Sequence, residues 1–136
     1  MQVGVEPMLI TDYNQLLSME VDDLPDVRVI HLVGECDLST ASMLGTELNQ
    51  AIADGRHVVL DVHLLTYIDS TGVLTIATAQ ETLAQNRRQL RIAGAHGILS
   101  RILRISRLDG HIPTHETVDE AIQEIVVSAN GRTPPA

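Results

Sequence analysis

The sequence has 136 residues, the length of one domain, and its 44% hydrophobic and 20% charged residues are typical of a globular protein. Nine basic residues against eighteen acidic ones give a net charge of -9, which argues against direct binding of nucleic acid, because that binding needs clustered cations. No apolar run approaches the ~20 residues of a membrane span, and the start of the chain has no signal-peptide pattern. The sequence therefore predicts a cytoplasmic protein that is not bound to a membrane.

The residues that enzymes and metal sites require are sparse. A single cysteine, Cys36, excludes an internal disulfide and a zinc site built on paired thiolates. The glycine-rich motifs that bind dinucleotides or nucleotide phosphates are absent, and the chain contains no lysine. The six histidines show no metal-ligand spacing. We therefore expect no cofactor, no metal and no catalytic residue, although a small enzyme with Ser70 as its nucleophile stays open on the residues alone.

The first part of the chain predicts two strands joined by a turn. Residues 1–12 show little pattern and are taken as an N-terminal extension. Residues 16–21 form a short apolar run that ends at the turn-like segment 22–25. Residues 27–33 alternate in the manner of a strand. One face of this second strand would carry Val27, Val29, His31 and Val33, and the other face Arg28, Ile30 and Leu32.

The middle of the chain predicts a helix, a buried strand and a second helix. The first helix would run from Ser39 or Thr40 to Asp54, with Leu44, Leu48 and Ile52 on one side. Residues 57–62 are almost continuously apolar, which is typical of a parallel strand buried on both faces. A loop over 63–69 would lead into a helix from Ser70 to about Asn86. Its inner side would carry Val73, Ile76, Ala77, Leu83 and Ala84.

The last part of the chain predicts a strand over 90–93 and a helix over 98–106 with Ile98, Ile102 and Ile105 inward. A short edge strand over 111–113 and a helix over 117–128 that begins with a Thr117–Glu120 capping box would follow. Residues 130–136 are predicted to be a flexible tail. Strands that alternate with helices after an opening hairpin indicate an α/β domain over residues 13–129. We expect a mixed central sheet of four to five strands packed with about four helices.

Basic residues are concentrated late in the chain. Residues 87–110 hold six arginines and one acidic residue. Three of them, Arg101, Arg104 and Arg107, recur at every third position and would form a stripe on a helix. The sequence leaves two interpretations open, a solvated helix face and a contact with an acidic partner.

The turn from Tyr67 to Gly72 joins the buried strand to the second helix. A hydroxyl group at the start of a helix lies beside unpaired backbone N–H groups and the positive end of the helix dipole, which stabilise an added phosphate. In the alternative, Ser70 only caps the helix and Gly72 only allows close packing. Asp61 and Asp69 are either paired carboxylates at this edge of the sheet or separate acids that cap the backbone.

Two motifs resemble the STAS domain of anti-sigma factor antagonists. They are Gly34-Glu35-Cys36-Asp37 and, after a helix and a strand, Asp69-Ser70-Thr71-Gly72. The resemblance implies a single STAS-like domain in which Ser70, or alternatively Thr71, accepts a phosphate. It further implies that the unphosphorylated protein binds an anti-sigma factor that is also a serine kinase, and so releases a sigma factor. Phosphorylation would end that binding, and a serine phosphatase would restore it.

The same resemblance implies which residues contact the partner: Gly34, Glu35, Asp37, Asp69, Ser70, Thr71, Gly72 and Val73. Asp37 would either have a functional role, in contacting the partner or in positioning the serine, or cap the first helix. The chain departs from the family at Ser106-Arg107-Leu108, where Ser-Gly-Leu is frequent, and at Cys36, where a redox role stays open. STAS domains also serve as scaffolds or as subunits of transport complexes, so a structural role without a switch is the alternative.

Overall fold

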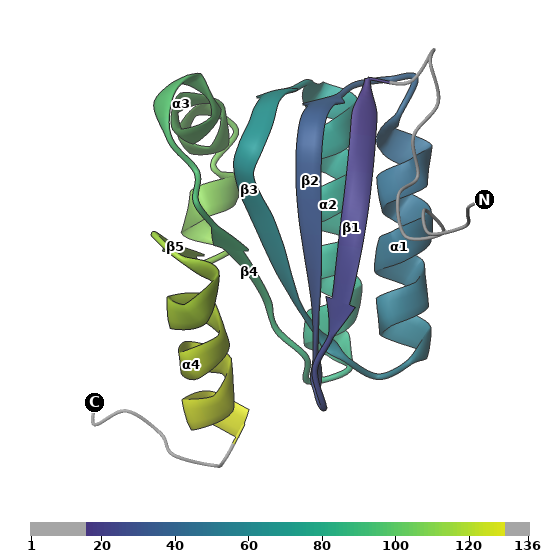
Figure 1. Cartoon of the computed structure of the whole chain (residues 1–136), viewed down its shortest axis with the longest axis vertical. Helices are drawn as coiled ribbons and strands as arrows, with labels where there is room; N and C mark the ends of the chain where they lie inside the picture. Colours follow the sequence, from purple (N-terminus) through teal and green to yellow (C-terminus); the bar gives the residue numbers. More distant parts are fainter. Residues whose placement is uncertain (1–15, 130–136) are drawn as a thin grey trace, which may run out of the picture.

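The computed structural model describes residues 16–129, so the predicted extension over 1–12 and the predicted tail over 130–136 lie outside the described residues. Its centre is a five-stranded sheet with the spatial order β1-β2-β3-β4-β5 (Figure 1). β1 pairs with β2 in antiparallel orientation, and the other neighbours are parallel, which confirms the predicted mixed sheet. The strands are β1 (Leu17–Asp23), β2 (Val27–Cys36), β3 (His57–Ile68), β4 (Leu90–Ala93) and β5 (Thr114–His115).

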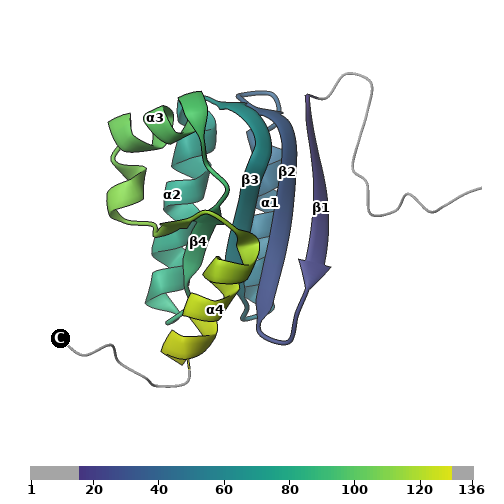
Figure 2. The same ribbon diagram turned by 60° about the vertical axis from the view of Figure 1, so that its left-hand side comes forward.

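Helices cover both faces of the sheet. Figures 1 and 2 show α1 and α2 side by side on one face and α4 on the other. A short 3-10 turn, η2 (Leu108–Gly110), follows α3. Within residues 16–129, no helix combines the length and the apolar character that crossing a membrane requires. The helices are α1 (Ala41–Ala53), α2 (Ser70–Gln85), α3 (Gly97–Ile105) and α4 (Val118–Ala129).

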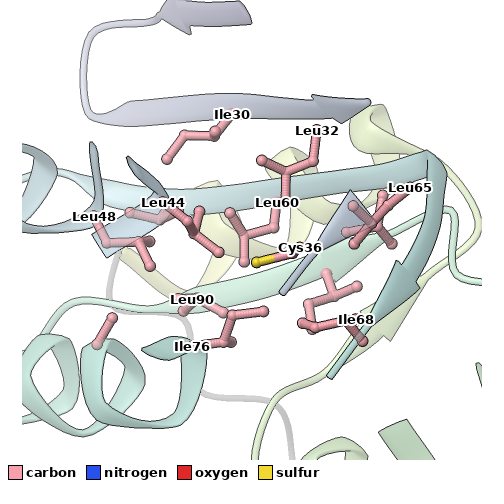
Figure 3. Close-up of a cluster of buried hydrophobic side chains, with 14 of the residues drawn as sticks. Ile30, Leu32, Cys36, Leu44, Leu48, Leu60, Leu65, Ile68, Ile76 and Leu90 are labelled. Carbon is pink, nitrogen blue, oxygen red and sulfur yellow. The ribbon is translucent and has the colours of Figure 1, made fainter. Parts of the chain in front are cut away.

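The main core lies between the sheet and helices α1, α2 and α3, and a smaller one lies under α4. Residues 57–62 of β3 are all buried, as the continuous apolar run predicts for a strand covered on both faces. In β2 the alternation also holds, because Ile30 and Leu32 belong to the main core whereas Val27 and Val29 pack under α4. Figure 3 shows that the main core is aliphatic, with the sulfur of Cys36 among leucine and isoleucine side chains.

The third strand is longer than the sequence predicts. The segment 63–69, predicted as a loop, continues β3 as far as Ile68 and pairs with the end of β2 through Leu64, Leu65 and Tyr67. Two register shifts interrupt this pairing, and polar residues stand among the apolar ones, so the local pattern resembles a loop. The extension carries the start of α2 to the same edge as the end of β2. The predicted edge strand is also displaced, since β5 follows Pro113 at Thr114–His115.

Helix α3 exposes residues that the sequence places inside. Its buried side chains are Leu99 and Leu103, whereas Ile98 is 58% exposed and Ile105 is 73% exposed. Ile102 is half-buried against the core. The leucine pair and the isoleucine triad have the same helical spacing, so periodicity alone cannot decide which stripe faces the sheet.

Helix α2 also differs from the prediction in one residue of its inner side, because Ala84 is exposed whereas Ala79 is buried.

The capping box at α4 is formed in part. The Glu120 N–H donates to Thr117 Oγ1 over 3.1 Å, while the Glu120 carboxylate accepts from the N–H of Glu116. The start of α4 is therefore fixed by the residues that the sequence indicates.

Candidate functional site

The ends of β2 and β3 bring two loops to the same edge of the sheet. Cys36 and Ile68 are paired across the two strands, and the N–H of Asp69 donates to the Cys36 carbonyl oxygen over 3.0 Å. The N–H of Leu38 donates to Asp69 Oδ2 over 3.1 Å. These bonds tie the loop after β2 to the turn before α2. The structure thus brings the two motif segments together, although they are about thirty residues apart in the sequence.

Asp69 is the N-cap residue of α2. Its Oδ1 accepts from the N–H of Gly72 over 3.0 Å, and its carbonyl oxygen accepts from the N–H of Val73 over 2.9 Å. The interpretation in which Ser70 itself caps the helix is therefore wrong, because Asp69 makes the capping bond. Ser70 is the first residue of the helix and is exposed. Its hydroxyl lies at the positive end of a 16-residue helix and is open to solvent.

Gly72 allows the turn to pack directly on the core. A Cβ atom at this position would lie 2.6 Å from Ile68 Cγ1 and 2.9 Å from Cys36 Sγ. Both distances are too short for real carbon contacts, so a side chain here would push the start of α2 away from the sheet. The predicted packing role of Gly72 agrees with this geometry, and the residue itself is buried.

The Cys36 thiol is buried beneath this turn. Burial raises the pKa of Cys36 to about 11, and the negative charges of Asp69 and Asp37 act in the same direction. The thiol is therefore protonated and inaccessible near neutral pH, which are the properties of an unreactive cysteine. Nothing in this environment supports a redox role for Cys36.

Asp37 stabilises its own turn. Its Oδ1 accepts from the N–H and from the hydroxyl of Ser39, over 2.9 Å and 2.7 Å, and these bonds lower the pKa of Asp37. Its carbonyl oxygen accepts from the N–H groups of Thr40 and Ala41 at the start of α1. The Asp37 carboxylate does not cap α1, because the N-cap residue of this helix is Thr40 and no side chain makes a capping bond there; a contact of Asp37 with the partner stays a prediction. Thr40 is fully buried, and its hydroxyl donates to the Glu35 carbonyl oxygen.

An open groove of about 690 Å³ lies beside Ser70, between α2, α3 and η2. We call it the α2–α3 groove. Leu74 and Ile105, two of its apolar side chains, are 65% and 73% exposed. The sequence patterns did not predict this surface. One signal is present in the sequence, because Leu74 is an apolar residue outside the predicted inner side of α2, a position that indicates exposure. The lining consists of Tyr67, Ile68, Asp69, Ser70, Val73, Leu74, Ala77, Ile102, Ile105, Ser106, Arg107, Leu108 and His111.

Arg107 follows the end of α3 with φ of 62°, a left-handed conformation. Glycine is the usual residue at such a position, and a residue with a side chain there costs roughly 1 kcal/mol or more. The side chain is exposed and lines the α2–α3 groove. Arg101 and Arg104 are exposed on α3, so the predicted arginine stripe lies on the surface.

Asp61 and Asp69, which the sequence could pair, belong to different environments. They are eight residues apart along the extended strand, about 25 Å. The Asp61 carboxylate contacts His31 Nδ1 at 2.6 Å and His63 Nδ1 at 2.8 Å. The other ring nitrogen of His31 lies 3.0 Å from Asp22 Oδ2, so both nitrogens face carboxylates and the ring is bonded as an imidazolium.

This arrangement shifts the pKa of both groups. Burial alone would lower the pKa of His31, but the hydrogen bonds to Asp61 and Asp22 outweigh it and raise the pKa. Burial alone would raise the pKa of Asp61, but the hydrogen bonds from His63 and His31 lower it. Within the part of the chain that the structure describes, no group of three or more histidine, cysteine or acidic side chains is arranged to hold a metal ion. The cluster is thus a charge network at the sheet surface.

Comparison with known families identifies the family to which this fold and turn belong. The model of the STAS domain family matches residues 18–121, which is most of the chain. The chain belongs to the STAS domain family. Its edge turn, with the capping Asp69 and the exposed Ser70, is therefore the turn of a STAS domain.

Individual relatives of this STAS chain include anti-sigma factor antagonists. An anti-sigma F factor antagonist of Paenibacillus polymyxa is 25% identical over 113 residues, covering 82% of this chain and 97% of that protein. A crystal structure of an anti-sigma factor antagonist from Mycobacterium paratuberculosis is also 25% identical, with a TM-score of 0.73 and coverage of 80% and 93%. The Bacillus cell fate determinant SpoIIAA in its phosphorylated form shares the fold, with 19% identity, a TM-score of 0.64 and coverage of 79% and 98%.

Proposed function

We propose that this STAS protein is an anti-sigma factor antagonist controlled by phosphorylation of Ser70. In its unphosphorylated form it binds an anti-sigma factor with serine kinase activity, and a sigma factor is released. The observation that carries the proposal is the exposed Ser70 hydroxyl at the start of α2, beside an aspartate that already caps the helix. The names of the relatives, and a related fold known in a phosphorylated form, support the same function.

The charge of a phosphate explains how the switch acts. A phosphoserine adds about -1.5 to -2 charges at neutral pH, next to Asp69 and on a chain with a net charge of -9. A partner surface that packs against the unphosphorylated turn would meet this added charge and lose complementarity. The hydrogen bonds that the Asp69 carboxylate accepts from the N–H groups of Gly72 and Leu38 do not involve the Ser70 hydroxyl, so the backbone of the turn keeps its shape in both states.

The binding surface is the edge of the sheet around Ser70. Its side chains come from Glu35, Asp37, Asp69, Ser70, Thr71 and Val73, each half-buried or exposed. Gly34 and Gly72 shape this edge, because a side chain at Gly34 would collide with the Leu16 carbonyl oxygen and one at Gly72 with the core. Ser70 is preferred over Thr71 as the phosphate acceptor because Ser70 is exposed whereas Thr71 is half-buried.

The proposal assigns the protein a role in bacterial transcription. It acts in the cytoplasm through binding alone, with no catalysis of its own, and a serine phosphatase returns it to the binding state. The alternative is a structural role, in which a STAS scaffold or transport-complex subunit uses the same surface without a switch.

Site-mapped mass spectrometry tests the assignment of Ser70. The chain is incubated with ATP and each anti-sigma kinase of its own genome, together with the variants Ser70→Ala and Thr71→Val. Ser39→Ala is the matched control, because Ser39 is another exposed serine at this edge. We expect one phosphate on the wild type, on Thr71→Val and on Ser39→Ala, and none on Ser70→Ala. A phosphate on Thr71 alone would move the site, and no modification by any kinase would favour the structural role.

Binding measurements test the consequence of phosphorylation. Ser70→Ala should stay bound to the anti-sigma factor in the presence of ATP, since it cannot be phosphorylated. Ser70→Asp should bind more weakly, because it places a negative charge at the turn. Release of Ser70→Ala under these conditions would contradict the proposal.

A further inference from the structure

The α2–α3 groove has the character of a binding surface. Its lining includes apolar side chains from the end of β3, from α2, from α3 and from η2. Its volume of about 690 Å³ is in the range of roughly 300–1,000 Å³ that is typical of ligand pockets. Leu74 and Ile105 remain largely exposed on its walls, at 65% and 73%. Exposed apolar side chains gathered at one groove are typical of a surface that a partner covers.

The groove is continuous with the proposed switch. Asp69 and Ser70 form part of its lining, so a partner that covers Ser70 also reaches the apolar side chains that line the groove. This continuity favours a protein over a small molecule as the occupant, because one protein surface can cover both the turn at Ser70 and the groove beside it.

The groove carries an arginine in a chain that is acidic as a whole. Arg107 and His111 line it, and Arg104 is exposed one turn before Arg107. Arg107 adopts a left-handed backbone conformation that favours glycine, so its guanidinium group stands at the groove at a cost to the fold. The charge of an arginine at this position complements a carboxylate on the segment that fills the groove.

We propose that the α2–α3 groove receives an apolar segment of the partner protein and that Arg107 selects a segment that carries a carboxylate. This inference rests on the proposed function, because the partner is the same anti-sigma factor. A phosphate on Ser70 then enters the groove that holds the partner's carboxylate and competes with it for the arginine. The groove thus selects which partner protein binds, and phosphorylation of Ser70 controls whether that partner binds.

Four variants test the proposal, in two matched pairs. Arg107→Gly removes the guanidinium group and relieves the backbone, and Arg87→Gly makes the same change at a left-handed arginine after α2, outside the groove lining. Ile105→Ala removes an apolar wall residue, and Ile98→Ala removes an exposed isoleucine of the same helix that does not line the groove. None of the four side chains is buried, so all four variants should fold.

The measurement is calorimetric titration of each full-length variant with the purified anti-sigma factor at several salt concentrations. We expect Arg107→Gly and Ile105→Ala each to raise Kd about tenfold, while both controls stay within about twofold of the wild type. Arg107→Gly should also reduce the dependence of Kd on salt, which Ile105→Ala leaves unchanged. Thermal melting should show that neither glycine variant loses stability through its backbone.

The outcomes separate this inference from the proposed function. A wild type that binds no anti-sigma factor of the genome overturns both. Binding that Ser70→Asp weakens but Arg107→Gly and Ile105→Ala leave unchanged overturns the groove assignment alone. An unchanged salt dependence in Arg107→Gly overturns the selection of a carboxylate. Sedimentation that shows a dimer of this chain, dissociated by Ile105→Ala, would make a second copy the occupant and overturn the assignment to the partner.

Discussion

Replacement of Asp69 tests how the turn before α2 is held. Its two carboxylate oxygens have separate tasks, because Oδ1 caps α2 through Gly72 and Oδ2 holds the loop after β2 through Leu38. Asp69→Ala removes both bonds. Asp69→Ser keeps an oxygen that can accept from the N–H of Gly72, but the shorter side chain loses the hydrogen bond with the N–H of Leu38.

The expected magnitudes follow from these two bonds. Loss of an N-cap side chain costs roughly 0.5–2 kcal/mol, and the exposed N–H of Leu38 can bond to water instead, so its bond adds little. We expect Asp69→Ala to lower the free energy of unfolding by about 1.5 kcal/mol and Asp69→Ser by about 0.5 kcal/mol. For a domain of this size, 1.5 kcal/mol corresponds to a decrease in Tm of roughly 5 °C.

Urea unfolding followed by circular dichroism measures both variants, and hydrogen exchange reports the Gly72 and Leu38 amides separately. Asp69→Ser should keep the Gly72 amide protected while the Leu38 amide exchanges faster. Asp37→Ala is the control, because the Asp37 carboxylate bonds to Ser39 within its own turn. Equal stability of Asp69→Ala and the wild type, or equal exchange at Gly72 in both variants of Asp69, would refute the capping role.

Three further predictions concern packing, reactivity and pH. Gly72→Ala should destabilise the fold by about 2 kcal/mol in urea unfolding, because its methyl group overlaps the core; an unchanged midpoint would contradict the packing role. The native Cys36 thiol should resist iodoacetamide at neutral pH and react only in denaturant, as intact mass would show; rapid native labelling would refute its inertness. The raised pKa of His31 means that its contribution to stability is complete below the unfolded value of about 6.5 and is lost as pH rises through the folded pKa. The lowered pKa of Asp61 keeps its carboxylate charged above about pH 4. His31→Gln should therefore lose most stability near pH 5–6, relative to the wild type and to the exposed control His111→Gln. A loss of stability that does not vary with pH would contradict the imidazolium form of His31.

The sequence predicts most of the elements because their signals are local. The alternation in β2 and the apolar run at the start of β3 indicate a buried strand pair, and both strands begin at the predicted residues, although both run beyond their predicted ends. Thr117 and Glu120 mark the start of α4 by a hydrogen bond within one turn. Such signals need only a few neighbouring residues, so the sequence contains all of the information that they require.

The end of β3 shows where local signals fail. Residues 63–68 alternate poorly because two register shifts interrupt their pairing with β2. Their strand conformation depends on bonds to a strand about thirty residues earlier, which no window of neighbouring residues contains. The site depends on this extension, since it carries Asp69 and Ser70 to the edge where β2 ends.

Helix α3 shows a second kind of failure. Both the isoleucine stripe and the leucine stripe have helical spacing, and only the packing of the helix on the sheet places Leu99 and Leu103 inside. Ile105 then remains at the surface and becomes a wall of the α2–α3 groove. A pattern of apolar residues therefore predicts that a face will be covered, but it does not tell whether the core or a partner covers it.

The sequence by itself determined the fold class, the order of the elements and the motif around Ser70, because these depend on composition, periodicity and short spacings. Only the tertiary structure decided that Asp69 rather than Ser70 caps α2, that the Ser70 hydroxyl is exposed, and that a groove with Arg107 lies beside it. Exposure and grooves arise where elements distant in the chain pack together or leave a surface uncovered. Their physical cause is the burial of apolar surface across the whole domain, which residue spacing along the chain does not record.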